Sequence, residues 1–397
     1  MTLAFDVKEY EGRVVLARKA VAEAGLDALI VTAPENICYL SGFWTAGYHI
    51  FQALVLPAGA EPFLVVRNIE IGNVDEHSWI RKAYAINNLD IALDTLVEAM
   101  RAEGIEKGRI GVEVDGARFT VTRPDQLTAL MPAATFVPAL DIVEPLRAVK
   151  SEAEVGYIRQ AVAKAERALV AGVCGLVEGA TDSHVAAMVQ GELALAGSEF
   201  TGSPSYIVEG VASGRAHAVH ANRPIPRNGH VWLEVSASVN RYQGVTSRIG
   251  GFSITGETRK FFDISSDAVD AMMKAMRPGA TAGAVDAAGR AVTEAHGVRD
   301  LWKNRAAYSI GLSFPPGLGE GHIIDIKPGE QKKMKAGMVF HLIPILKVPG
   351  IGAVARTETV LVTEEGGQRL GTLDPVPLTP EMVSATGDNA LVGLKMR

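Results

Sequence analysis

The chain has 397 residues, of which 48% are hydrophobic and 21% are charged, so it can bury a substantial core and is expected to form two or three domains. Its formal net charge is −6, and no basic run exceeds two residues, as at Lys332 and Lys333. Nucleic acid and anionic membranes are therefore not expected as partners, and a small or zwitterionic ligand is the better expectation.

The cysteines and the N-terminal sequence bear on the cellular compartment. Cys38 and Cys174 lie in apolar surroundings without the spacing of a zinc site or a redox motif, so both are expected to be buried thiols. The N-terminal stretch lacks the apolar core of a signal peptide, and no uncharged run approaches the roughly 20 residues that span a bilayer. We expect a cytoplasmic protein.

From residue 8 to about 145, segments with helical spacing alternate with segments typical of strands. "EYEGRVVLARKAVAEAG" predicts a helix that stops at Gly25, and "LDALIVTA" predicts a buried strand. "NICYLSGF" is a second short element, and "FQALVLPAGAEPFLVV" predicts two strands around an Ala-Gly turn. The helix "LDTLVEAMRAEG" then leads to the strand "RIGVEV". This alternation indicates an α/β domain with a mixed sheet.

A domain boundary is predicted at about residue 150. Ser151 followed by Glu154 is a capping-box signature, and apolar residues then recur at helical spacing, so a long amphipathic helix begins there. Helices are expected near 183–196 and 265–277, with strands within "HVWLEVSASVNRYQGVTSRIGGFSITGE". "GMVFHLIPIL" and "ARTETVLVTEEGG" are expected to form a strand pair closed by a turn, and the last dozen residues a loose tail.

Several motifs resemble one superfamily. "SYIVEGVASG", "HVWLEVSASVNRYQGVTSRIGGF", "YSIGLSFPPGLGEGH", "GMVFHLIP" and "TETVLVTEEGG" occur in the order and spacing of the pita-bread fold of methionine aminopeptidase, proline dipeptidase and creatinase. The resemblance spans nearly the whole chain. It implies an α/β creatinase-type N-terminal domain over residues 1–150 and an α+β pita-bread catalytic domain over residues 151–397.

The metallopeptidases of this superfamily bind two metals through two aspartates, a histidine and two glutamates. In this sequence the corresponding positions, in that order, are Glu234, Val245, Tyr308, Ile343 and Glu358. Two carboxylates remain, whereas a dinuclear site needs several converging oxygen or nitrogen donors, and valine and isoleucine donate nothing. We therefore expect no metal and no other cofactor.

The resemblance to creatinase and, more closely, to ectoine hydrolase implies a metal-free enzyme. Both cleave carbon–nitrogen bonds in guanidinium or amidine compounds. We therefore expect a hydrolase of a non-peptide C–N bond in a small amidine, guanidine or cyclic amide that carries a carboxylate, with an ectoine-like compound the leading substrate. One alternative is a metal-dependent lyase or Xaa-Pro dipeptidase of the same fold, similar to dimethylsulfoniopropionate lyase. Another is a non-catalytic binding protein.

Four residues are candidates for the catalytic groups. In the resemblance to creatinase, His217 in "RAHAVH" lies within one residue of the position of the general acid/base, and His220 is the candidate if the insertion falls differently, so the choice between them is open. Glu358 is expected to bind a substrate N–H or to orient the water, and Glu234 invites the same interpretation. The alternatives are exposed loop histidines, and for Glu358 an ion pair with a nearby arginine.

The remaining candidates are expected to bind substrate. Glu320 and His322 lie in a glycine-rich loop, and His341 shares a strand face with Ile343, toward the vacated metal position. Satisfied core residues or solvated loop side chains are the alternatives. The full set of expected substrate-binding residues is Phe43, Trp44, Tyr48, His49, Arg67, Tyr242, Arg248, Tyr308, Glu320, His322 and His341.

Two features of the sequence are expected to recognise a zwitterionic substrate. The aromatic run at 43–51 suits either a core or a cage over a delocalised cation, and in creatinase relatives this region reaches the partner subunit's site, so the resemblance implies a homodimer with a shared site. Arg67 could clamp a carboxylate, with Arg241 and Arg248 as alternatives. Ser247 replaces a further glutamate of creatinase, which disfavours creatine itself.

Overall fold

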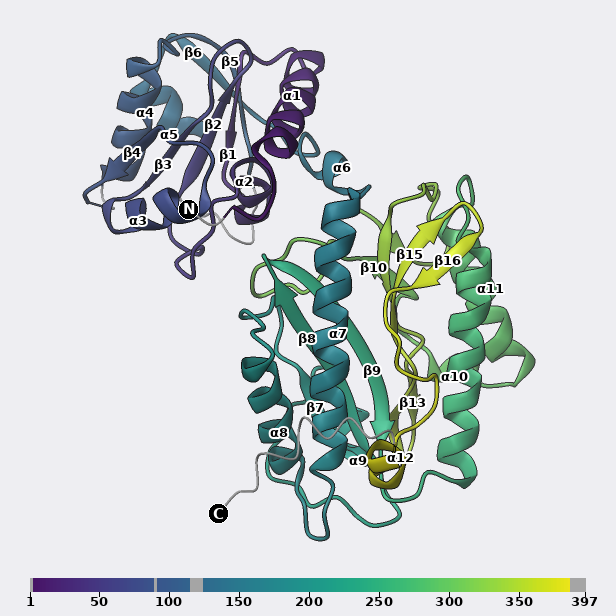
Figure 1. The fold of residues 1–397 in the computed structure, drawn as a ribbon. Helices are drawn as coiled ribbons and strands as arrows, with labels where there is room; N and C mark the ends of the chain where they lie inside the picture. The colour runs from purple at the N-terminus through teal and green to yellow at the C-terminus, as the bar shows by residue number, and fades with distance from the viewer. Residues whose placement is uncertain (1–2, 89–90, 115–123, 386–397) are drawn as a thin grey trace. The chain divides into compact units, whose positions relative to one another are not determined.

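The computed structural model describes residues 3–88, 91–114 and 124–385, and the expected C-terminal tail lies outside this part of the chain. The chain divides into two compact units, Met1–Arg147 and Ala148–Arg397 (Figure 1). The second unit, which holds the cavity described below, contains most of the motifs on which the resemblance rests.

The first unit is built on a six-stranded mixed sheet with the order β4-β3-β2-β1-β5-β6. Strand β1 pairs antiparallel with β2 and parallel with β5, in agreement with the mixed sheet expected from the alternating pattern. The strands are β1 (Ala28–Val31), β2 (Ala53–Pro57), β3 (Phe63–Arg67), β4 (Ala83–Ile86), β5 (Gly108–Val112) and β6 (Ala134–Pro138).

Helices flank this sheet. They are α1 (Val7–Glu23), α2 (Pro34–Ser41), α3 (Ile71–His77), α4 (Ala92–Ala102), α5 (Pro124–Leu130) and α6 (Glu144–Arg147). The first begins at the Asp6 cap, whose carboxylate accepts from Lys8 N–H, and ends where Gly25 takes a positive φ of 67°. The short element around "NICYLSGF" is the helix α2, which begins with a proline at its first position.

The second unit holds two main sheets and a hairpin. The three-stranded sheet has the order β7-β8-β9, and the five-stranded sheet has the order β11-β10-β12-β15-β16. The strands are β7 (Tyr206–Glu209), β8 (Val231–Val239), β9 (Tyr242–Gly250), β10 (Ala307–Ser309), β11 (Asp325–Ile326), β12 (Val339–Leu342), β13 (Leu346–Val348), β14 (Gly352–Val354), β15 (Glu358–Thr363) and β16 (Gly366–Arg369).

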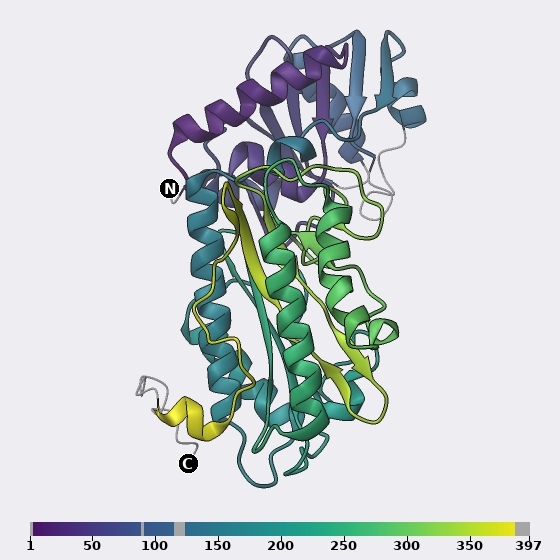
Figure 2. The same ribbon diagram turned by 90° about the vertical axis from the view of Figure 1, so that its right-hand side faces the viewer.

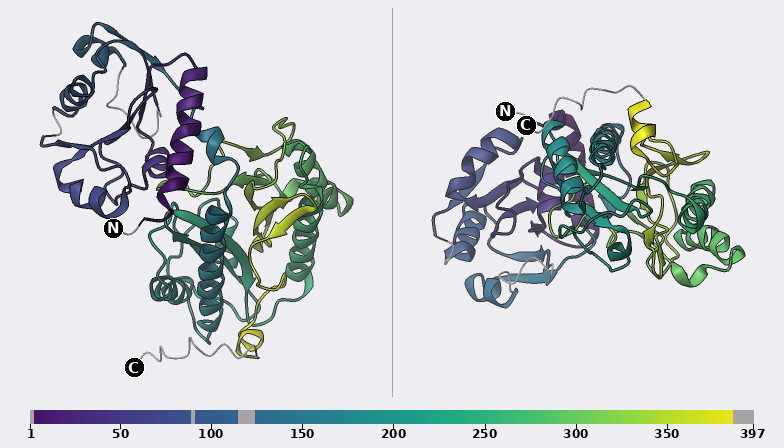
Figure 3. Two further views of the ribbon diagram at one scale, coloured as in Figure 1. Left: turned by 45° about the horizontal axis from the view of Figure 1, so that its top comes forward. Right: turned by 90° about the horizontal axis from the view of Figure 1, so that it is seen from below.

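Helices cover both sides of these strands. The helices are α7 (Glu152–Cys174), α8 (Asp182–Leu195), α9 (Gly210–Ser213), α10 (Gly256–Ala275), α11 (Ala282–Ala295) and α12 (Pro380–Ala385). Helices α7 and α8 lie on one side of the strands, and α10 and α11 lie together on the other (Figures 2 and 3). Two separate hydrophobic clusters follow from this arrangement, one under each helix pair.

Helix α7 shows how local and tertiary constraints combine. Its capping box is complete, because Ser151 accepts from Glu154 N–H and the Glu154 carboxylate accepts from Ser151 N–H. Its apolar face packs on β8 and β9. At the crossing with β9, a Cβ on Gly244 would lie 2.2 Å from the backbone nitrogen of Val162, so only glycine fits there.

Three sequence expectations need correction, and the first is the helix expected near 265–277, which begins earlier, at Gly256, and ends at Ala275. The segments containing β12 and β15 do pair, with His341 opposite Thr359, but the β13–β14 hairpin lies between them along the chain and the turn instead joins β15 to β16. Cys174, expected to be buried, is exposed because it lies at the C-terminal end of α7, while Cys38 is buried. Within the described residues, no helix is both long enough and apolar enough to cross a bilayer.

Candidate active site

A cavity of about 460 Å³ lies in the second unit, bounded by strands and loops that are far apart in sequence. It combines one carboxyl group, one histidine, two tyrosines and three cationic side chains with an apolar wall. Its polar and apolar side chains include Ser203, Tyr206, Arg215, His217, Trp232, Glu234, Asn304, Arg305, Tyr308, Ile343, Ile345 and Lys347. Of the four predicted catalytic residues, His217 and Glu234 line this cavity.

Tyr206 lies between these two residues, opposite Glu234 through strand register and beside His217 through a ring contact. Tyr206 on β7 lies directly opposite Glu234 on β8, so their side chains share a face with Cβ atoms about 5 Å apart. The Tyr206 and His217 rings are 5.9 Å apart between centroids, and the Tyr206 hydroxyl lies 2.9 Å from that of Ser203. Tyr206 therefore lies beside both the carboxyl group and the imidazole.

His217 has an unusual backbone. Its φ is 55°, in the left-handed region that glycine favours and that other residues adopt at a conformational cost. The side chain is exposed and reaches the cavity from the loop after α9. His220 is exposed as well, but it is absent from the cavity wall, so the geometry favours His217 over His220 as the acid/base group.

The Glu234 carboxyl group is suited to proton transfer near neutral pH. Burial in the cavity wall disfavours its charged form and raises its pKa to about 7, while a hydrogen bond from Trp232 acts in the opposite direction. Functional carboxyl groups in enzymes commonly have pKa values raised in this way. Glu234 is therefore the carboxyl group of this site.

Tyr308 forms another part of the wall and is tied to the protein interior. Its hydroxyl lies 2.9 Å from His341 Nδ1, and His341 Nε2 lies 2.8 Å from the Thr357 hydroxyl. Burial lowers the pKa of His341 to about 3 and raises that of Tyr308. His341 thus faces toward the vacated metal position, as its place on the strand predicted. It is fully buried, however, and reaches the cavity only through Tyr308.

Three cations that the sequence interpretation missed lie around the cavity. Arg215 and Arg305 are exposed and Lys347 is partly exposed, and Arg305 pairs with Asp325 at 2.8 Å while lying 4.5 Å over the Tyr308 ring. The sequence feature that could have identified two of these cations is their closeness to candidate residues. Arg215 precedes His217 by two residues and Arg305 precedes Tyr308 by three.

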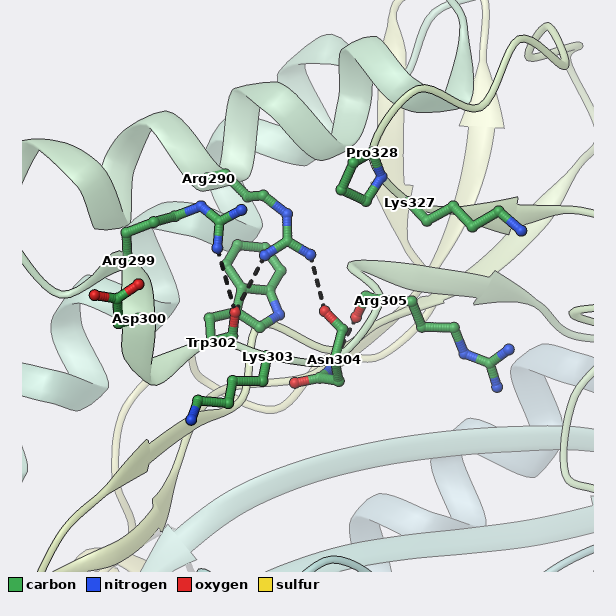
Figure 4. Close-up of a pocket in the computed structure, with 9 residues that line it drawn as sticks. All are labelled: Arg290, Arg299, Asp300, Trp302, Lys303, Asn304, Arg305, Lys327 and Pro328. Carbon is green, nitrogen blue, oxygen red and sulfur yellow. Dashed lines mark hydrogen bonds between the residues drawn. The ribbon is translucent and has the colours of Figure 1, made fainter.

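A second, more open cavity of about 470 Å³ shares Asn304 and Arg305 with the first. Figure 4 shows Arg290 donating to the carbonyl oxygens of Trp302 and Asn304, at 3.2 and 2.8 Å. Arg290 is itself held by both oxygens of Asp286. This network fixes the segment that carries Arg305 into the wall of the first cavity.

Glu358 does not line the cavity. It is 1% exposed, and its Oε1 accepts from Arg248 at 2.7 Å, Arg356 at 2.9 Å and Arg369 at 3.4 Å. Arg248 is itself fully buried, and burial lowers its pKa. The geometry therefore disagrees with the expected roles of Glu358 and Arg248 at the substrate and favours the ion pair that was left open as the alternative.

Several other side chains that were expected to bind substrate bond to other protein groups instead. Glu320 forms a buried pair with Lys150 at 2.7 Å, because the glycine-rich loop turns its carboxylate inward. The Tyr242 hydroxyl donates to Glu154 at 2.8 Å, and the buried Arg241 binds the carbonyl oxygen of Ser313. His322 is exposed and does not line the cavity, so the second unit brings none of these side chains to it.

The aromatic run of the first unit is partly core. Phe43 is 1% exposed, whereas Trp44 is partly exposed and stacks on His77 with ring centroids 5.0 Å apart. Tyr48 and His49 contact edge to face at 5.6 Å. Arg67 ends β3 and is partly exposed. A shared site in a homodimer, with these side chains as its cage, stays a prediction.

The donor set does not fit the dinuclear metal centre of the metallopeptidases. Tyr308 and Ile343 line the cavity where a histidine and a glutamate would be needed, Val245 is fully buried, and Glu358 is engaged by arginines. Among residues 3–88, 91–114 and 124–385, no three His, Cys, Asp or Glu side chains are gathered as ligands. Glu234 alone would not hold two divalent ions.

Comparison with known proteins assigns the chain and its fold to a family. Residues 156–364 match metallopeptidase family M24, and residues 13–149 match the creatinase/prolidase N-terminal domain. The chain therefore belongs to family M24, with a creatinase-type first domain followed by the pita-bread domain, as the motifs indicated.

Similar proteins carry several activities in their names. Ectoine hydrolase from Halomonas elongata is 25% identical over 93% of this chain and 97% of its own, and the putative dipeptidase YkvY from Bacillus subtilis is 23% identical over 88% and 94%. Among solved structures, dipeptidase PepE from Mycobacterium ulcerans has a TM-score of 0.80 at 24% identity, covering 94% of this chain and 99% of its own. The prolidase from Pyrococcus horikoshii has a TM-score of 0.79 at 21% identity, covering 91% and 99%. These structures confirm the fold.

Proposed function

We propose that this protein is a metal-independent hydrolase of a non-peptide C–N bond in a small amidine, guanidine or cyclic amide that carries a carboxylate, with an ectoine-like compound as the leading substrate. The observation that supports it most is that His217 and Glu234 line one cavity whose metal positions hold Tyr308 and Ile343. The resemblance to ectoine hydrolase over 93% of the chain supports the same reaction class.

The proposed reaction uses the two groups in different ways. His217 accepts a proton from water as the water oxygen bonds to the amidine or amide carbon, and it returns that proton to the nitrogen as the C–N bond breaks. Glu234, in its ionised form, accepts hydrogen bonds from the water or from a substrate N–H. One water is consumed. In an amide its OH ends on carbon and its other hydrogen on the leaving nitrogen, whereas in an amidine or guanidine its oxygen becomes the carbonyl oxygen of the product and both of its hydrogens end on nitrogen.

The cations and the apolar wall define the substrate class. Within the described part of the chain, neither Arg215 nor Lys347 has an ion-pair partner, and with Arg305 they outnumber the single carboxyl group of the cavity. A substrate carboxylate is a suitable counter-charge for these groups. Trp232, Ile343 and Ile345 offer apolar surface to a small ring.

A dipeptidase is the second candidate, because several relatives carry that name. A peptidase of this fold would need the metal pair to activate water, and the side chains at the metal positions argue against it. We therefore favour the metal-free reaction.

The proposal predicts that purified protein hydrolyses ectoine or a related cyclic amidine, and that exhaustive chelation leaves the rate unchanged. The assay compares ectoine, creatine and a Xaa-Pro dipeptide before and after chelation, with the metal content measured in parallel. Cleavage of the dipeptide alone, lost on chelation and restored by a transition metal, would establish the second candidate instead.

A further inference from the structure

Three hydrogen-bonding side chains connect the protein interior to the cavity. Thr357, directly before β15, lies 2.8 Å from His341 Nε2 on β12, and His341 Nδ1 lies 2.9 Å from the Tyr308 hydroxyl on β10. Thr357 and His341 are fully buried, and Tyr308 is the member of the series that lines the cavity. A neutral imidazole donates through one nitrogen and accepts through the other, so the series has a direction.

The direction of the series follows from asking which arrangement gives each buried hydroxyl hydrogen an acceptor. If His341 carried its proton on Nε2 and donated to Thr357, the buried Thr357 O–H would have no acceptor, because no other partner of this hydroxyl exists among the described residues. The nearby Ser247 hydroxyl, on the strand that bridges to Thr357, does not supply this acceptor, because it is buried and forms no hydrogen bond within the described part of the chain. A buried O–H without an acceptor is costly, so this arrangement is disfavoured.

The opposite direction gives an acceptor to the Thr357 and His341 hydrogens of this series. Thr357 donates to Nε2, Nδ1–H donates to the Tyr308 oxygen, and the Tyr308 hydrogen is then free to point into the cavity, where water or substrate can accept it. The position of a histidine in the metallopeptidases is thus taken by an oriented hydrogen-bond donor.

We infer that Tyr308 donates a hydrogen bond to the oxygen on the attacked carbon of the substrate, and that His341 and Thr357 position this donor. In a cyclic amide that oxygen is the carbonyl oxygen, and in an amidine it is the oxygen that water brings. The inference rests on the proposed function for the identity of the acceptor, whereas the direction of the series rests on geometry alone.

The surroundings suit this role. Burial raises the pKa of Tyr308, so the phenol keeps its hydrogen, and burial lowers the pKa of His341 to about 3, so the imidazole stays neutral. The ring is held in place, since a Cβ on Gly319 would lie 2.2 Å from it and Arg305 lies 4.5 Å over its face. A preorganised donor of this kind stabilises negative charge that develops on oxygen.

Nitrogen NMR of the ¹⁵N-histidine-labelled protein tests the direction. The two-bond ¹H–¹⁵N pattern separates the tautomers, and His341 is assigned by His341→Asn and, independently, by signals that stay constant from about pH 5 to about pH 8. His230, the other buried histidine with a lowered pKa, is separated by His230→Asn. We expect His341 to be protonated on Nδ1. Protonation on Nε2 would overturn the inference, whether or not the protein hydrolyses ectoine.

Kinetics with ectoine test the role of the donor. Tyr308→Phe should lower kcat by about 10²- to 10³-fold with little change in KM. Thr357→Val should lower kcat to a smaller extent, and Thr357→Ser should restore it, which a purely structural role would not require. Tyr84→Phe is the matched control, because it removes a phenol that hydrogen-bonds Glu103 in the first unit. Normal kcat in Tyr308→Phe would refute the inference, while absence of turnover in the unmodified protein would refute the proposed substrate and leave the NMR result decisive.

Discussion

Replacing Glu234 with Gln should lower kcat/KM for the hydrolysed substrate by roughly two to four orders of magnitude while the fold survives. The amide keeps the shape of the side chain and one acceptor, but it loses the charge that orients water or holds a substrate N–H. In the unmodified protein kcat/KM should rise as Glu234 ionises near pH 7, and the variant should lose this step. Stopped-time assays from about pH 5 to pH 9 measure both effects.

The same substitution should increase stability at high pH. Because burial raises the pKa of Glu234 from 4.5 to about 7, the unfolded chain binds fewer protons between these values, and the stability of the unmodified protein falls as pH rises through this window. The cost reaches about 2 to 3 kcal/mol above pH 7 and is absent below about pH 4.5. Glu234→Gln should remove it, as urea unfolding at both ends of the window will show.

A matched control is Glu257→Gln, which neutralises an exposed carboxylate in the first turn of α10. It should change neither the pH profile nor the stability by more than about 0.5 kcal/mol. If Glu234→Gln retained normal kcat/KM at every pH, Glu234 would have no catalytic role.

Replacing Glu358 with Gln should instead destabilise the protein by about 3 to 5 kcal/mol and leave turnover per folded molecule nearly unchanged. Its carboxylate compensates two buried guanidinium groups, those of Arg248 and Arg356, at 2.7 and 2.9 Å. The neutral amide would leave these cations without their shared counter-charge. Thermal and urea unfolding measure the stability, and active-site-normalised single-turnover rates measure the chemistry.

Asp270→Asn provides the comparison within the same network. Asp270 also pairs with Arg356, at 2.8 Å, but its side chain is 62% exposed, so its loss should cost no more than about 1 kcal/mol. A Glu358→Gln variant of normal stability whose single-turnover rate falls at least a hundredfold would show that Glu358 acts on the substrate after all.

The family and the order of domains could be predicted from the sequence because they depend on local, contiguous signals. The capping box of Ser151 and Glu154 involves residues three apart and formed as expected. The motifs on β8, β9, β12 and β15 each occupy a short stretch, and the comparisons confirm the fold that they indicated. Even the expected replacement of metal ligands at Val245 and Ile343 is a property of single positions.

The assignment of the carboxylates depended on pairing between distant strands. Glu234 and Glu358 both occupy strands with similar apolar neighbours, so the alternation along each strand does not distinguish them. Only the tertiary structure places Arg248, Arg356 and Arg369 around Glu358 and leaves Glu234 facing a cavity. A buried cation must find a counter-charge, and which carboxylate supplies it depends on strand register rather than on composition.

The sequence by itself therefore determined the fold, and it predicted the loss of the metal ligands and the candidates His217, Glu234 and Tyr308. The tertiary structure alone decided which candidates share a cavity, added Arg215, Arg305 and Lys347, and connected Tyr308 to His341 and Thr357. The physical reason is the distance along the chain over which each kind of interaction acts. Helix caps and strand alternation act over a few residues, whereas a site is made by side chains brought together from β7, β8, β10 and the loops between strands.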